Sequence, residues 1–216
     1  MTRCAAIETA DLTFGYRRGV TVIDGLTQAI RGGEVTAITG RSGSGKSTLL
    51  YLLAGMLTPW SGSVVFDGSD LAKMDDHARS RLRAETFGFV FQDAALDPRR
   101  SVLDAVLEPT LYASQPSAKA RDRALALLDL MGVDVPPESR PGEISGGQAQ
   151  RVGVARALLL DPQVIFADEP TGNLDNASSE AVLGALTAAA EGGCTVIIAT
   201  HDDRVVSRST GRITVA

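Results

Sequence analysis

Short apolar runs alternate with longer helical patterns along most of this 216-residue chain. Val35–Thr39, Val164–Ala167 and Thr195–Ala199 are short runs of β-branched and small apolar residues. Runs of this kind are typical of strands that are buried on both faces of a parallel sheet. Because helical patterns separate them, the chain is predicted to be an α/β protein with helices on both sides of a mainly parallel sheet.

The N-terminal part of the chain is predicted to be rich in short strands. The turn signal Asp24-Gly25 is expected to separate two of them, and the turn signal Asp67-Gly68 is expected to end another. The candidate strands in this part cover residues 11–16, 20–23, 26–30, 61–66 and 87–91.

Helical patterns fill the middle of the chain, at residues 93–160. Ser101, with Asp104 at the third position after it, is a signal for the start of one helix. Because strands precede and follow this stretch, we expect it to be a helical insertion into a core lobe of residues 1–92 and 161–216. Further helices are predicted at residues 121–131, 148–160 and 178–190.

A glycine-rich loop follows the candidate strand at Val35–Thr39, and a helical pattern follows the loop. It consists of Gly40-Arg41-Ser42-Gly43-Ser44-Gly45-Lys46-Ser47, which fits the nucleoside-triphosphate loop pattern without a mismatch. Its glycines let backbone N–H groups turn toward phosphate oxygens, and the next helix points its positive end at the same anion. Lys46 is expected to reach the β- and γ-phosphates, Ser47 to bind Mg²⁺, and Thr48 to belong to the nucleotide site.

Two acidic residues end the buried strand at Val164–Ala167. Asp168 is expected to hold Mg²⁺, and Glu169, whose side chain points differently, is the candidate general base. Acids also often simply begin a loop, so this interpretation depends on the phosphate loop elsewhere in the chain.

A second serine–glycine segment precedes the helix predicted at residues 148–160. It reads Glu143-Ile144-Ser145-Gly146-Gly147-Gln148. Ser-Gly-Gly at the start of a helix can form a second nest of backbone donors for an anion. An ordinary serine-capped helix is the alternative interpretation.

With these motifs in this order, the chain resembles the ABC-type ATPases, the nucleotide-binding subunits of ATP-binding-cassette transporters, over nearly its whole length. The segment Ile144–Gln148 is similar to the LSGGQ signature of that family, with isoleucine in the first place. Tyr16 resembles the aromatic residue that stacks on adenine, although it could also be a packing residue in a hairpin. The other similar elements are Gln92 at the Q-loop, Asp168-Glu169 at the end of the Walker B strand, Gly172-Asn173-Leu174-Asp175 at the D-loop and His201 at the switch position.

The resemblance implies the ABC ATPase fold, a P-loop NTPase fold with an N-terminal antiparallel β subdomain and an inserted α-helical subdomain. It also implies ATP and Mg²⁺ as ligands and a second copy of the chain as a partner. In that head-to-tail pair, each ATP would lie between the phosphate loop of one copy and Ser145–Gln148 of the other. Gln92 is expected to contact Mg²⁺ and relay the nucleotide state, His201 to hold the γ-phosphate, and Glu169 to activate water.

The stretch Asp168–Asp175 is similar to the branch that includes lipoprotein-release, macrolide-export and cell-division ATPases. This branch implies a transmembrane permease as a further partner, which would hold the chain at the cytoplasmic, inner face of the cell membrane. Residues 94–100, which would face that partner, depart from the commoner apolar run of the branch.

The net charge of −5 disfavours a nucleic-acid partner, since proteins that bind nucleic acid usually carry a basic face. A soluble ABC-type ATPase acting on nucleic acid or ribosomes stays open as an alternative, as does a non-catalytic regulatory cassette. Cys4 and Cys194 form no CxxC pair, so a disulfide scaffold or structural metal site is not expected. The apolar runs fall short of the roughly 20 residues that a membrane-spanning helix needs.

Overall fold

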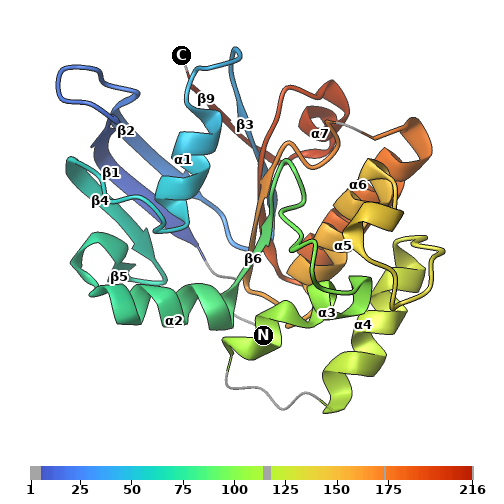
Figure 1. Cartoon of the computed structure of the whole chain (residues 1–216). Coiled ribbons are helices and arrows are strands. Elements are labelled where there is room, and N and C mark those ends of the chain that lie inside the picture. Colours follow the sequence, from blue (N-terminus) through green and yellow to red (C-terminus); the bar gives the residue numbers. More distant parts are fainter. Residues whose placement is uncertain (1–5, 114–117, 173, 216) are drawn as a thin grey trace.

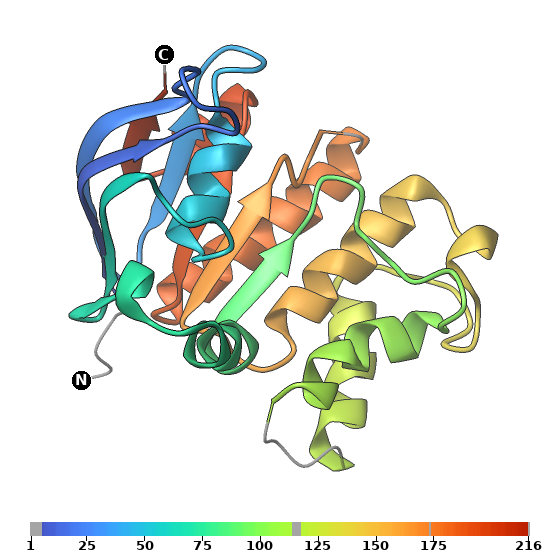
Figure 2. The same ribbon diagram turned by 60° about the vertical axis from the view of Figure 1, so that its left-hand side comes forward.

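Two β-sheets organise the chain in the computed structural model, which describes residues 6–113, 118–172 and 174–215. A parallel sheet lies at the centre, an antiparallel sheet packs on one side of it, and helices cover the other side (Figure 1). Figure 2 shows the same three layers from the side, with α1, Lys46–Leu53, between the two sheets. This arrangement confirms the predicted α/β fold class.

The central sheet has the strand order β6-β7-β8-β3-β9, and all of its pairings are parallel. Its inner strands contain almost only apolar and threonine side chains, which are buried on both faces, as the sequence predicted. The strands are β3 (Val35–Thr39), β6 (Phe87–Val90), β7 (Val164–Asp168), β8 (Thr195–Ala199) and β9 (Gly211–Thr214).

The antiparallel sheet has the order β2-β1-β4-β5 and is formed by the N-terminal strands. The predicted turn at Asp24-Gly25 is wrong, because β2 runs without a break through both residues. A register shift between the pairs Leu12–Leu26 and Phe14–Ile23 shows that a β-bulge, with Gly25 at φ 60°, occupies this place. The strands are β1 (Ile7–Phe14), β2 (Ile23–Ile30), β4 (Ser61–Phe66) and β5 (Ser69–Asp70).

The helices of the middle segment pack against one another and against β6. Ser101 caps α3 by accepting from Asp104 N at 3.1 Å, as its position in the sequence predicted. Residues 93–100 contain no helix, so the helical pattern begins later than expected. The helices of this segment are α3 (Val102–Leu107), α4 (Ala118–Leu130) and α5 (Gly146–Leu158), with short 3₁₀ turns at Glu108–Leu111 (η2) and Pro141–Glu143 (η3).

Alternate side chains of the central strands belong to different hydrophobic cores. On β7, Val164 and Phe166 pack toward α1 and the antiparallel sheet, whereas Ile165 and Ala167 pack toward α3–α6. Successive side chains of a strand point to opposite faces, so one short strand can join both cores. Packing in both cores therefore fixes the position of the carboxyl end of β7.

Several elements were not predicted from the sequence, among them two helices and a strand that lack a strong apolar pattern. Helix α2, Asp76–Thr86, buries none of its side chains, and α7, Asp203–Arg208, buries only Val205. Strand β9 is short and is held by its parallel pairing with β3. The remaining helix, α6, spans Asn176–Glu191, and a 3₁₀ turn, η1, spans Leu71–Lys73.

Gly88 on β6 should tolerate no side chain, because a Cβ atom there would lie 2.4 Å from the carbonyl oxygen of Ala157 on α5. We expect Gly88→Ala to lower the free energy of unfolding by about 1–3 kcal/mol, since the strand and helix must separate. Denaturant unfolding of both chains measures the difference.

Gly184 is the matched control, because a Cβ atom at this exposed position in the middle of α6 meets no atom within 4 Å. Gly184→Ala should raise the free energy of unfolding by about 0.5–1 kcal/mol. Equal effects of the two substitutions would contradict the close packing of β6 on α5.

Candidate active site

The phosphate loop connects β3 of the central sheet to α1 (Figure 1). A Cβ atom on Gly40 would lie 2.3 Å from the carbonyl oxygen of Val215, so this position requires glycine. Gly45 precedes α1 in the left-handed conformation, at φ 98°, which glycine adopts without strain. The loop therefore has the shape that its sequence predicts.

The loop has one cation and one unused hydroxyl at its centre. Lys46 is buried, and its Nζ donates to the carbonyl oxygens of Gly40 and Arg41, at 3.3 Å each. The buried Oγ of Ser44 has no hydrogen-bond partner among the described residues. Because buried polar atoms normally have partners, an orphaned hydroxyl inside a loop of N–H groups fits a bound phosphate.

Asp168, at the end of β7, contacts α1 through both oxygens of its buried carboxylate. Ser47 Oγ donates to Oδ1 at 2.8 Å, and Tyr51 Oη donates to Oδ2 at 2.9 Å. A hydroxyl and a carboxylate beside a phosphate site form the oxygen donor set that Mg²⁺ prefers. Among the described residues no cluster of three or more acidic, histidine or cysteine side chains could hold a metal, so phosphate would have to supply further ligands.

Glu169 is the point where three predicted catalytic residues meet. Its Oε1 lies 2.8 Å from His201 Nδ1 and 4.0 Å from Lys46 Nζ. Its Oε2 accepts from Thr200 Oγ1 at 3.2 Å. The backbone of Glu169 is left-handed, at φ 45°, which turns this side chain away from that of Asp168. The carboxylate is therefore held next to the cation of the phosphate loop.

Gln92 lies just after the end of β6, the strand that pairs with β7. Val90 on β6 pairs with Ala167 on β7. Gln92 lies two positions after Val90, and Glu169 lies two positions after Ala167. Gln92 is exposed. It therefore borders the site from the strand that leads into the helical segment.

Tyr16 lies over the first turn of α1. Its hydroxyl is 3.1 Å from Thr48 Oγ1, and its ring meets that of Phe14 edge to face, with centroids 5.1 Å apart. The residue as a whole is 64% exposed, so Tyr16 is accessible beside the phosphate loop. This placement suits an adenine platform better than a core packing role.

The signature segment forms the N-terminal end of α5. Ser145 Oγ accepts from Gln148 N at 3.2 Å, and Gln148 Oε1 accepts from Ser145 N at 2.9 Å, which is a capping box. Ser145 and Gly146 are exposed. This helix end lies in a different lobe from the phosphate loop (Figure 2). One chain thus does not bring its two predicted anion sites together.

The predicted D-loop connects the site to α6. Asn173 lies outside the described residues. Asp175 caps α6 by accepting from Ser178 N at 2.7 Å, and this hydrogen bond lowers the pKa of the carboxyl below its usual range. Leu174 packs against the hydrophobic core of the helical lobe.

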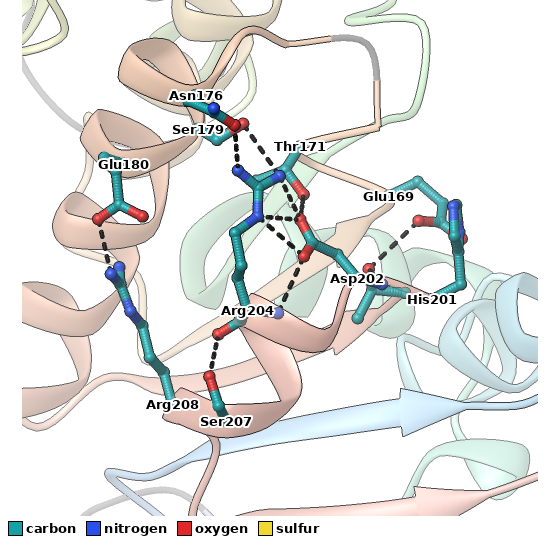
Figure 3. A network of polar contacts seen from close by, with 11 residues as sticks. Glu169, Thr171, Asn176, Ser179, Glu180, His201, Asp202, Arg204, Ser207 and Arg208 are labelled. Atoms are coloured by element: carbon teal, nitrogen blue, oxygen red, sulfur yellow. Dashed lines mark hydrogen bonds and ion pairs between the residues drawn. The ribbon is translucent and has the colours of Figure 1, made fainter.

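A polar network next to His201 joins the ends of β7 and β8 to α6 (Figure 3). Asp202 accepts from Thr171 Oγ1 at 2.9 Å and from two nitrogens of Arg204. Arg204 also donates to Asn176 Oδ1 at 3.1 Å. The Arg204 hydrogen bond lowers the pKa of Asp202 to about 2. The segment that carries His201 is therefore fixed to the helix behind the site.

Several residues that hold the site were not predicted from the sequence. Tyr51 could have been found, because it lies four positions after Ser47 and so shares its helix face. Thr200 directly precedes His201. Arg204 contacts Asp202 two positions before it, but its contact with Asn176 joins positions 28 apart, which no local pattern reveals.

The comparisons with known proteins agree with this geometry. The family model described as ABC transporter matches residues 23–172. The chain is 45% identical over 190 residues to the pyoverdine export ATP-binding/permease protein PvdT of Pseudomonas entomophila, covering 88% of this chain and 29% of that protein. It is 42% identical over 206 residues to the macrolide export ATP-binding/permease protein MacB of Brucella melitensis, covering 95% and 31%.

Solved structures give the same result. A dimeric, post-hydrolysis structure of the ATP-binding cassette MJ0796 bound to ADP and Pi has a TM-score of 0.90 at 32% identity, over 97% of this chain and 94% of that one. CbiO1 from Clostridium perfringens, part of the ABC transporter complex cbiONQ, has a TM-score of 0.82 at 31% identity, over 96% and 83%.

The chain therefore belongs to the ABC transporter family. The predicted similarity to the branch that includes macrolide-export ATPases is confirmed. The chain spans about 30% of the length of these two export relatives. None of the helices in the described ranges is long and apolar enough to cross a membrane.

Replacing Arg204 should make the chain less stable in a pH-dependent way. The folded pKa of Asp202 lies below its ordinary value of about 3.9, so the Arg204 contact stabilises the fold above that pH. This contribution fades as the pH falls toward about 2. Arg204→Ala should thus lower the free energy of unfolding at pH 7, and the deficit should narrow between about pH 5 and pH 3.

Denaturant unfolding at several pH values measures this, with Arg208→Ala as the control. Arg208 pairs with Glu180 at 2.6 Å on the same two helices, but both side chains are about half exposed. Its replacement should change the free energy of unfolding by less than about 1 kcal/mol. A deficit in Arg204→Ala that stays constant with pH would contradict the assigned role of Asp202.

Proposed function

We propose that this chain binds and hydrolyses ATP with Mg²⁺, and that two copies of it act together on a transmembrane permease. The observation that carries the proposal is the meeting of Lys46, Glu169 and His201 beside the phosphate loop. A cation, a candidate base and an imidazole then surround the place where a γ-phosphate would lie.

In this proposal, the phosphate loop surrounds the triphosphate with backbone N–H groups, and Ser44 donates its unused hydroxyl. Lys46 exchanges its contacts with two loop carbonyls for the β- and γ-phosphates. Tyr16 stacks on the adenine. The nucleotide-contacting set is Tyr16, Gly40, Arg41, Ser42, Gly43, Ser44, Gly45, Lys46, Ser47 and Thr48.

Ser47, Asp168 and Gln92 are the proposed residues around Mg²⁺. When bound, the ion would neutralise charge on the phosphates. Asp168 is already directed at Ser47, and Gln92 borders the same edge of the sheet.

Glu169 is the proposed general base for the attacking water. Thr200 holds Oε2, which leaves Oε1 to accept a proton once His201 turns away. The side chain of His201 is 75% exposed, so its ring has room to turn toward the γ-phosphate. Once the contact between Glu169 and His201 is broken, Glu169 would act on the water and His201 on the γ-phosphate.

A second copy is needed to complete the site. Ser145 and Gly146 are exposed at the N-terminal end of α5, in a different lobe from the phosphate loop of the same chain. A head-to-tail pair would bring Ser145–Gln148 of one copy onto the nucleotide of the other. The dimeric state of the similar cassette MJ0796 supports this arrangement.

A cleft of about 780 Å³ is the proposed docking place for the permease. It lies between α2 and β6 on one side and η2 and α5 on the other. Its lining combines aromatic and arginine side chains, which suits an amphipathic segment at the membrane surface. The names of the two export relatives, which join ATP binding to a permease, support this partner. Lining residues include Phe89, Phe91, Tyr112, Arg81, Arg83 and Arg156.

Arg156 on α5 could transmit movement between the nucleotide and this cleft. Its guanidinium donates to the carbonyl oxygens of Ala94 and Ala95, at 2.8 and 2.9 Å, and lies 3.3 Å from Glu108. Both alanines are left-handed, at φ 59° and 47°, which costs about 1–2 kcal/mol each. The signature helix thus holds the strained segment directly after Gln92.

Glu169→Gln is expected to abolish turnover while leaving ATP binding intact, because the amide keeps the size of the side chain but cannot accept a proton. ATP that is not hydrolysed should then hold two copies together. Size-exclusion chromatography with light scattering should show a dimer with ATP and Mg²⁺ and a smaller species without nucleotide.

Lys46→Ala is the comparison variant, and it should lose both ATP binding and the ATP-dependent dimer. Hydrolysis by the Glu169→Gln chain at the normal rate would exclude Glu169 as the base. A dimer that forms equally in all three chains without ATP would contradict nucleotide-driven pairing.

A further inference from the structure

The carboxylate of Asp168 is held from two places on one helix. Ser47 and Tyr51 lie four residues apart on α1, so they share one helix face. Ser47 donates to Oδ1 at 2.8 Å, and Tyr51 donates to Oδ2 at 2.9 Å. In the described part of the chain, these are the two side-chain hydrogen bonds that Asp168 accepts.

Asp168 needs such partners, because its carboxylate is almost completely buried, with 3% of the residue exposed. A buried charge without hydrogen bonds is costly. Tyr51 supplies one of these hydrogen bonds through an uncharged hydroxyl that reaches Oδ2 from α1. This hydrogen bond offsets part of the cost of burying the charge on Oδ2.

The two donors differ in what they can do when a metal arrives. Ser47 is itself a proposed Mg²⁺ ligand, so its hydroxyl would bind the ion through a lone pair while its hydrogen still points to Oδ1. Tyr51 lies a helical turn further from the phosphate loop and keeps its bond to Oδ2. Without Tyr51, the carboxylate would be held at Oδ1 alone and could rotate about that contact, which would change the direction in which its oxygens face the ion.

We propose that Tyr51 is a positioning residue for Mg²⁺, which acts by fixing Asp168 so that Oδ1 faces Ser47 and the phosphate loop. This inference rests on the proposed function, since it assumes that the site binds Mg²⁺ with ATP. Residues that orient a metal-binding carboxylate through hydrogen bonds commonly change metal affinity by tenfold or more when they are replaced.

A purely structural role for Tyr51 is the competing explanation. In that case the hydroxyl would only join α1 to the end of β7, and its loss would lower stability without a specific effect on the metal. The two roles are separated by comparing nucleotide binding with and without Mg²⁺, because only the positioning role affects the difference between them.

The test uses the full chain and Tyr51→Phe, which removes the hydroxyl and keeps the ring. A fluorescent ATP analogue is titrated in excess Mg²⁺ and in EDTA, and the ratio of the two dissociation constants gives the gain in affinity due to Mg²⁺. Tyr51→Phe should reduce this gain by about tenfold and leave the EDTA value unchanged.

Thr9→Val is the matched control, because Thr9 is a buried residue of β1 whose hydroxyl donates to the Leu26 carbonyl at 3.0 Å, away from the site. It should lower the unfolding midpoint and leave the gain due to Mg²⁺ as it is. An equal gain in the unchanged and Tyr51→Phe chains, or no gain in the unchanged chain, would overturn the role of Tyr51. Absence of nucleotide binding in either condition would instead overturn the proposed function, and this inference with it.

Discussion

The parallel pairing of β3, β8 and β7 is the constraint on which the site depends. Ala199 on β8 lies level with Ile38 on β3 and with Asp168 on β7. The carboxyl ends of parallel strands meet at one edge of a sheet, so this register brings the phosphate loop, the acidic pair and the histidine segment to the same edge. Shifting any of the three strands would separate groups that are now within about 4 Å of one another.

The charged residues of the resulting site are held by contacts within the chain. Lys46 contacts the loop carbonyls, Glu169 contacts His201, and Asp168 is bonded to α1. Each of these contacts satisfies a group that would later address a phosphate, a water or a metal. In the proposed function, binding would exchange these hydrogen bonds at fixed positions, and such preorganisation is how a site stabilises developing charge. The exposed end of α5, in contrast, has no such partner from the phosphate loop of its own chain, which is why the account requires two copies.

Much of the fold and of the site could be predicted from local sequence. The phosphate loop, the acidic strand end and the capped signature helix are each formed by residues that are close together in the sequence. A single sequence is therefore enough to predict them. The fold class followed from apolar runs such as Val164–Ala167. The bulge at Gly25 was misread as a turn, because positive φ suits both. The contacts of Arg156 with Ala94 and Ala95 could not be predicted, because they join positions about 60 residues apart, and α2 was not predicted because none of its residues is fully buried.

The central claim is that each phosphate loop is half of a site that a second copy completes. Cross-linking tests it most directly: one chain carries Ser42→Cys and a differently tagged chain carries Ser145→Cys, both with native cysteines replaced. Ser42 and Ser145 are exposed at the two surfaces that should meet. In the Glu169→Gln background, ATP with Mg²⁺ should give a disulfide between the two differently tagged chains on oxidation. No such cross-link with ATP, while the same chains bind nucleotide normally, would contradict the account.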